Sequence, residues 1–90
     1  MAYSLEHDSI SASCYNLVAL INHCMTDADH FEEEYGHNGI TSMLYSRTKA
    51  MDGILFSLLF LLPKDESTKV LAKIKFKESY CKLTGRKELR

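Results

Sequence analysis

The stretch EYGHNGIT, residues 34–41, separates two long segments in which apolar residues recur at helical spacing. Gly36 can supply the positive φ that ends many helices, and Asn38 tolerates the same conformation. A helix that ends here, followed at once by another, runs back along the first when the loop is short. The stretch therefore predicts that two helices lie antiparallel to each other.

The segment before this break, residues 8–35, predicts one long helix. Its apolar residues alternate in steps of 4 and 3, which keeps a single stripe facing a partner. The stripe consists of Ile10, Cys14, Leu17, Ile21, Cys24, Ala28, Phe31 and Tyr35. Thr and Asp are poor helix formers, so the run Thr26-Asp27-Ala28-Asp29 leaves open whether the helix kinks or restarts there.

The segment after the break, residues 40–62, predicts a second helix with more apolar surface than one partner can cover. Its main stripe is Leu44, Thr48, Met51, Leu55, Leu58 and Leu62, yet its last two turns are apolar nearly all round. Small residues would also let another helix approach closely. We therefore expect a homo-oligomer whose interface contains Ala50, Gly53, Ile54, Phe56, Ser57, Phe60 and Leu61.

Pro63 cannot continue the second helix, and a third helix is predicted over residues 67–84, with Gly85 as its stop. Ninety residues form one domain with a thin core. The sequence thus predicts an all-α fold in a single domain, residues 1–90. It is either a three-helix antiparallel bundle or a long helical hairpin plus a third helix, and oligomerisation completes its core.

Cysteine usage and hydropathy predict a cytoplasmic protein. Three Cys cannot all pair within one chain, and the first residues do not resemble a secretion signal. The longest charge-free apolar stretch, Ile54–Leu62, has nine residues, whereas a membrane-spanning helix needs ~20. A reducing cytoplasm without membrane contact is the simplest location.

The net charge of -1 hides two oppositely charged parts. Residues 1–63 contain eight acidic and two basic residues, and residues 64–90 contain nine basic and four acidic residues. On a continuous third helix, basic residues would form two rows: Lys69, Lys73 and Lys77, and Lys75, Lys82 and Arg86. Such rows can neutralise phosphates, but the acidic first helix opposes this, so nucleic-acid binding ranks last among our hypotheses.

The most acidic part of the chain, residues 23–37, also contains three of its four histidines. His23, Asp27, His30 and Glu34 follow each other in steps of 4, 3 and 4 and are the only candidate metal ligands. The other helices offer no matching carboxylate motif, and no zinc-binding or catalytic motif occurs. We predict no metal, no cofactor and no catalytic residues, and interpret the region as a solvated helix face.

A weaker pattern lies at the start of the second helix. Free backbone amides at residues 36–41 together with Tyr45, Ser46, Arg47 and Lys49 could hold a phosphate. This leaves an alternative function open, a sequestering receptor for a phosphorylated small molecule or nucleotide.

The sequence favours a small non-enzymatic interaction protein that occludes a surface on a partner macromolecule, as inhibitors and immunity proteins do. An origin in a phage or other mobile element fits this class by analogy of fold alone. The expected partner is another protein, in particular a nucleic-acid-binding enzyme, because an acidic surface can imitate phosphates. The predicted contact residues are Asp27, Asp29, Glu32, Glu33 and Glu34.

Overall fold

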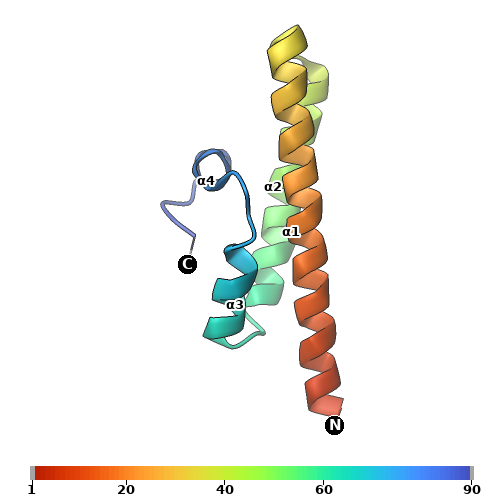
Figure 1. Cartoon of the computed structure of the whole chain (residues 1–90), viewed down its shortest axis with the longest axis vertical. Coiled ribbons are helices and arrows are strands. Elements are labelled where there is room, and N and C mark those ends of the chain that lie inside the picture. The colour runs from red at the N-terminus through yellow and green to blue at the C-terminus, as the bar shows by residue number, and fades with distance from the viewer. Residues whose placement is uncertain (1, 90) are drawn as a thin grey trace.

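The computed structural model describes residues 2–89, with side chains for residues 8–89, and all regular secondary structure in that range is α-helical. The elements are α1 (Ala2–Tyr35), α2 (Gly39–Leu59), α3 (Lys64–Leu71) and α4 (Lys77–Thr84). α1 and α2 lie side by side and antiparallel, α3 packs against α1, and α4 packs against α2 (Figure 1). The predicted all-α fold, a long helical hairpin with further helical structure packed on it, is confirmed.

The hairpin turn forms where the sequence predicts it. Gly36 has a φ of 71° and donates its N–H to the carbonyl of Glu32, which closes the end of α1. The Asn38 side chain accepts hydrogen bonds from the amides of Ile40 and Thr41, and the Thr41 hydroxyl accepts one from the Asn38 amide. This capping box starts α2, and a good cap stabilises a helix by about 1 kcal/mol.

α1 is one continuous helix, so it neither kinks nor restarts at residues 26–29. Met25 and Ala28 flank or lie within this run and are both buried against the rest of the protein. Their packing outweighs the weak helix propensity of Thr and Asp, which costs only ~0.5 kcal/mol per residue. The predicted apolar stripe fails at its end, because Tyr35 lies where no helix faces it and is 67% exposed.

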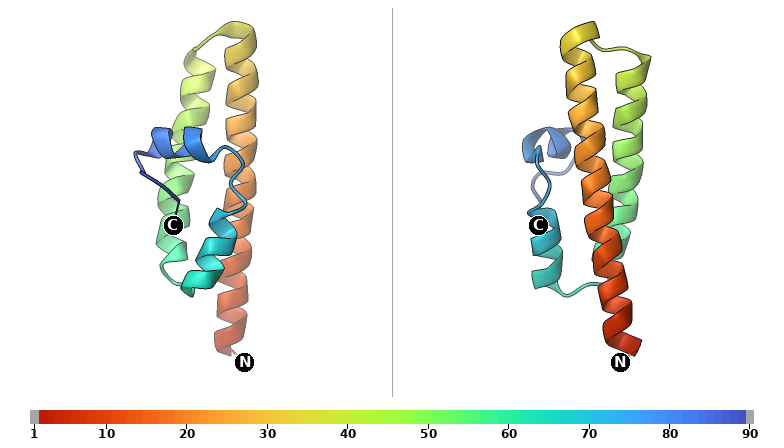
Figure 2. Two further views of the ribbon diagram at one scale, coloured as in Figure 1. Left: turned by 60° about the vertical axis from the view of Figure 1, so that its left-hand side comes forward. Right: turned by 45° about the vertical axis from the view of Figure 1, so that its right-hand side comes forward.

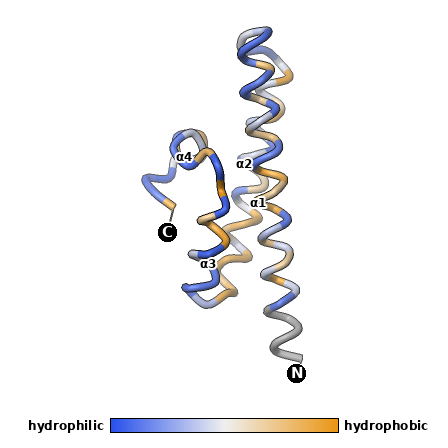
Figure 3. Tube along the Cα trace, viewed as in Figure 1, coloured by the Kyte–Doolittle hydropathy of each residue, from blue (hydrophilic) through white to orange (hydrophobic). Residues whose placement is uncertain are grey.

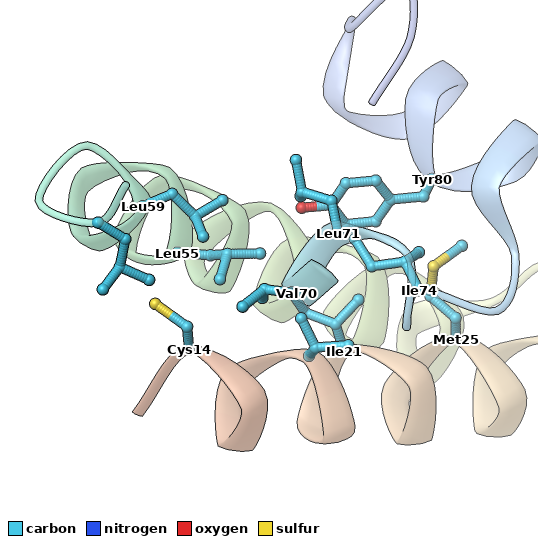
Figure 4. Close-up of a cluster of buried hydrophobic side chains, with 11 residues drawn as sticks. Cys14, Ile21, Met25, Leu55, Leu59, Val70, Leu71, Ile74 and Tyr80 are labelled. Atoms are coloured by element: carbon cyan, nitrogen blue, oxygen red, sulfur yellow. The ribbon is translucent and has the colours of Figure 1, made fainter. Parts of the chain in front are cut away.

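The core lies between one side of the α1–α2 hairpin and the segment that contains α3 and α4 (Figure 4). α1 contributes Cys14, Val18, Ile21 and Met25, α2 contributes Leu55 and Leu59, and the C-terminal part contributes Val70, Leu71, Ile74 and Tyr80. Each large apolar side chain buried in this way stabilises the fold by about 1.5–3 kcal/mol.

The predicted third helix, residues 67–84, is wrong as a single element. α3 begins earlier, at Lys64, directly after Pro63, and α2 ends at Leu59, because residues 60–62 form tight turns. Residues 72–76 then separate α3 from α4. On a continuous helix Tyr80 would point 120° away from Ile74, at about 100° per residue. The break lets both side chains reach the hairpin, where both are fully buried.

Asn22 of α1 holds this break in place. Its side-chain amide donates to the carbonyl of Lys73 at 3.0 Å and accepts from the amide of Lys75 at 2.9 Å. Lys77 Nζ donates to the carbonyls of Ala72 and Ile74, at 3.2 and 2.9 Å, and so satisfies the end of α3. These bonds replace the helical hydrogen bonds that the chain loses between α3 and α4.

α3, α4 and their connections, residues 63–89, are called the arm below. The arm lies on one face of the layer formed by α1 and α2, and the views in Figure 2 show the opposite face without any covering element. The molecule is elongated along α1, with extents of 51 × 23 × 16 Å.

Replacing Asn22 by Ala should lower the free energy of unfolding by about 1–2 kcal/mol, because two hydrogen bonds to the arm backbone are lost. Chemical denaturation followed by circular dichroism measures this. Asn16→Ala is the matched control, since Asn16 is exposed on the same helix and should change stability by less than ~0.5 kcal/mol. Equal effects of the two substitutions would contradict the role of Asn22.

Candidate functional surfaces

A buried carboxylate on α2 forms the main polar contact between the hairpin and the arm. The Tyr80 hydroxyl donates to Asp52 Oδ1, and Arg86 binds the same carboxylate through two bonds, Nε to Oδ1 and Nη2 to Oδ2, both 3.0 Å. The Arg86 guanidinium also lies 3.4 Å above the centre of the Phe56 ring. Salt bridge, hydroxyl and ring together fix α4 and the residues after it on α2.

The Asp52 cluster, which consists of Asp52, Tyr80, Arg86 and Phe56, has the properties of a structural contact. Burial, and then the hydrogen bond to Asp52 and its negative charge, raise the pKa of Tyr80 far above its ordinary value. The hydrogen bond to Asp52 raises the pKa of Arg86 despite partial burial. Tyr80 therefore stays neutral and Arg86 charged, and neither is poised to transfer a proton near neutral pH.

Sequence reasoning missed the Asp52 cluster. The available signal was Asp52 itself, the single acidic residue of α2, which lies on the buried side of the helix between Thr48 and Leu55. A charge on an apolar stripe requires a partner. The partner could not be identified, because Arg86 lies 34 residues away, beyond the predicted end of the third helix at Gly85.

The predicted acidic residues lie at the turn end of the hairpin, beyond the arm, but do not form one stripe. Asp29 and Glu33 are four residues apart and share one side of α1, while Asp27 and Glu34 are seven apart and share another. Glu32 lies between these two sides and contacts the turn, where His37 Nδ1 donates to Glu32 Oε1 at 2.9 Å. These five acids surround the end of α1, and they are called the acidic end.

His37 belongs to the turn and not to a metal site. Its ring bonds Glu32 on one side, approaches Ser42 Oγ at 3.0 Å on the other, and stacks on Tyr45 with ring centres 6.2 Å apart. Of the candidate ligands His23, Asp27, His30 and Glu34, only His23 and Asp27 approach each other, at 3.9 Å. Among the side chains described, residues 8–89, no group of three or more His, Cys, Asp or Glu could hold a metal ion.

The residues of the alternative phosphate site do not converge. The amides of Ile40 and Thr41, expected to be free, are bonded to Asn38. Successive helix positions differ by about 100°, so Tyr45 and Lys49 share one side of α2, whereas Ser46 and Arg47 each point in another direction. Burial and the neighbouring Glu32 carboxylate raise the pKa of Tyr45, and this negative environment opposes an anion.

The predicted rows of basic residues are wrong, because the third helix is interrupted. Lys69 belongs to α3, Lys73 and Lys75 to the connection, and Lys77 caps α3. The arm does contain a hollow of about 640 Å³ between α3, α4 and the residues after α4. Leu71 and Cys81 line it beside charges of both signs, including Lys82 and Glu78. The arm is thus a mixed, mainly basic surface.

The predicted oligomer-interface residues occupy different sides of α2. Ala50, Gly53, Ile54, Ser57 and Leu61 are exposed. Phe56 lies beneath Arg86, and Phe60, which is 92% exposed, lines a hollow next to α3.

Within residues 2–89 no helix is both long enough and apolar enough to cross a membrane. No family model, no curated protein and no solved structure matches the chain.

Replacing Asp52 by Ala should destabilise the protein by about 2–4 kcal/mol, because the Tyr80 hydroxyl loses its acceptor and Arg86 its counter-charge. The measurement is urea denaturation at pH 7. Asp29→Ala removes an exposed acid from a helix and should stay within ~0.5 kcal/mol of the wild type. A loss below ~1 kcal/mol for Asp52→Ala would show that the Asp52 cluster is dispensable.

Tyr80 should make stability depend on alkaline pH. Its pKa is higher in the folded than in the unfolded chain, so its contribution is complete below pH ~10 and is lost as the pH rises above that value. Thermal unfolding between pH 8 and 11 measures the effect. Tyr80→Phe should be less stable at pH 8 and lose stability less steeply above pH ~10. Parallel curves for wild type and variant would refute this.

Proposed function

We propose that this protein is a non-enzymatic interaction protein that inserts the acidic end of its hairpin into a basic site on another protein and occludes it. This places it with inhibitors and immunity proteins, and a phage or other mobile element is a suitable source for such a binder. Its three thiols are free, which suits a reducing cytoplasm.

The observation that carries this proposal is the position of the acidic end. Asp29, Glu33 and Glu34 are exposed and form no ion pair within the described residues, and the acids that do form ion pairs contact only His37 and His23. The hydrogen bonds of the basic arm to α1 go to Ser11 and Asn22, both on the N-terminal side of these acids. Carboxylates this close together act as one negative surface, since screening in ~0.1 M salt extends over ~10 Å.

The distribution of the acids around α1 suits a concave partner. Asp29 and Glu33 would face one wall of a cleft, and Asp27 and Glu34 the opposite wall. Exposed Tyr35 and Ile40 add apolar contact area at the same end, while the end as a whole is mainly hydrophilic (Figure 3). An aromatic side chain surrounded by charges is a common composition for the centre and rim of a protein interface.

The chemistry of the partner follows from that of the acidic end. Carboxylates spaced along a helix present oxygen acceptors as a phosphate backbone does, so the matching surface contains Arg and Lys. A nucleic-acid-binding site on an enzyme has this composition and shape. Blocking such a site requires binding only, which is consistent with a protein that lacks a catalytic motif.

Reversing two charges, Asp29→Lys with Glu33→Lys, should weaken partner binding at least roughly tenfold, because like charges then face each other. Both positions are exposed, so circular dichroism should show unchanged helicity. Proteins captured from the native host by wild type and variant are compared by mass spectrometry, and the affinity of each captured partner is then measured.

The matched control reverses two exposed charges of the arm, Lys69→Glu with Lys73→Glu. This control should retain the partners that the acidic end loses. If the acidic-end variant binds the same partners with unchanged affinity, the proposal is wrong.

A further inference from the structure

The face of the hairpin opposite the arm exposes large apolar side chains. Asn22 and Asp52 bond the arm, and a shift of two helix positions turns a side chain by about 200°. Leu20 and Ile54 are two positions from them and therefore point to the opposite face, where each is 54% exposed. Figures 1 and 2 agree that no element of the described chain covers this face. We call it the open face.

The open face contains one row of side chains from each helix, spaced by seven residues. The row on α1 is Ser13, Leu20, Asp27 and Glu34, and the row on α2 is Ile40, Arg47 and Ile54, with exposed Leu61 in the turn after the helix. Exposed Met43, Ala50 and Ser57 complete the α2 row to the alternating steps of 3 and 4 typical of a coiled-coil seam. This seam is separate from the buried stripe of Leu44, Leu55 and Leu59, which faces the core.

Because α1 and α2 are antiparallel, the two rows match in height. The Glu32 carboxylate lies near enough to Tyr45 to raise its pKa, and His37 Nε2 lies within hydrogen-bond distance of Ser42 Oγ. Residues at equal height on the two helices therefore have numbers that sum to about 77 near the turn. Leu20 and Ile54, and likewise Asp27 and Arg47, have numbers that sum to 74, so the members of each pair lie within about 4.5 Å of equal height. The open face thus has an apolar layer next to a layer with one charge of each sign.

We propose that a second copy of this chain covers the open face, related to the first by a two-fold axis parallel to the hairpin. This axis puts α2 of one copy opposite α1 of the other, at equal height. Leu20 then meets the partner's Ile54, and Arg47 meets the partner's Asp27, twice in each dimer. In the resulting dimer two layers of two helices each pack face to face, and both arms lie on the outside.

Charge decides between this arrangement and the other two-fold packing. With the axis perpendicular to the helices and centred on the apolar layer, Arg47 would face the partner's Leu61 and Asp27 the partner's Ser13. Neither charge would then face a counter-charge on the partner, whereas the parallel axis gives each of them one. The parallel axis places Asp27 of each copy opposite the partner's Arg47.

The size of the open face is sufficient for a stable dimer. The 21 residues of α2 extend over ~31 Å, and two helices ~10 Å wide give ~600 Å² of projected area. A standard interface buries ~800 Å² per partner, and the surface of interlocking side chains exceeds its projection. The second copy therefore gives the apolar surface of α2 a partner that the monomer lacks.

Sedimentation equilibrium from micromolar to roughly millimolar concentration tests this inference. The wild type should reach twice the chain mass of 10.3 kDa, and Ile54→Glu should remain a folded monomer. Phe60→Glu is the matched control, because Phe60 is more exposed than Ile54 but lies on the arm side. A monomeric wild type, a dimeric Ile54→Glu or a monomeric Phe60→Glu would each overturn the proposed face.

Charge reversal tests the axis. Arg47→Glu and Asp27→Lys should each raise the dimer dissociation constant roughly tenfold or more, because like charges then face each other. An equimolar mixture of the two variants should recover a dimer as stable as the wild type, since each reversed charge meets its complement on the other chain. Dimers of Arg47→Glu with wild-type stability, or no recovery on mixing, would overturn the parallel axis. Arg47→Glu lies outside the acidic end and both variants keep Asp29 and Glu33, so failure of the dimer and failure of the proposed function can be told apart.

Discussion

A carboxylate on the buried side of α2 must be neutralised and hydrogen-bonded, and much of this structure meets that requirement. Asp52 accepts hydrogen bonds from the Tyr80 hydroxyl and from Nε and Nη2 of Arg86. To bring these groups to one point, the chain after α3 has to turn, so the helical ladder breaks at residues 72–76. Asn22 and Lys77 then satisfy the backbone groups that the break leaves free.

The same contacts determine which surface the protein leaves open. The arm is bonded to Ser11 and Asn22 on α1 and to Asp52 on α2, all on one side of the hairpin. Its short helices cannot also reach the other side. The core and the open face therefore involve two separate stripes of α2. The arm packs against the first, and the second is exposed and is the proposed contact with a second copy.

The charge distribution follows from this geometry as well. Most basic residues belong to the arm, which lies beside the middle of α1, while the acidic end lies at the turn of the hairpin (Figure 1). The basic residues of the arm are thus kept apart from the acidic end, and Arg86 pairs with Asp52. Asp29 and Glu33 form no ion pair within the described residues and lie on a different side of α1 from the open-face row, so they can act on another molecule while a second copy covers that face.

The sequence by itself determined the helices and the turn of the hairpin, because apolar spacing, Gly36 and Asn38 act over a few residues. It also located the acids and the excess apolar surface of α2. Only the tertiary structure decided that the third helix breaks, that Asp52 meets Arg86, and that the acids surround α1. These depend on contacts between residues 34 to 53 apart in the chain or on the continuity of α1, and local propensity does not specify either.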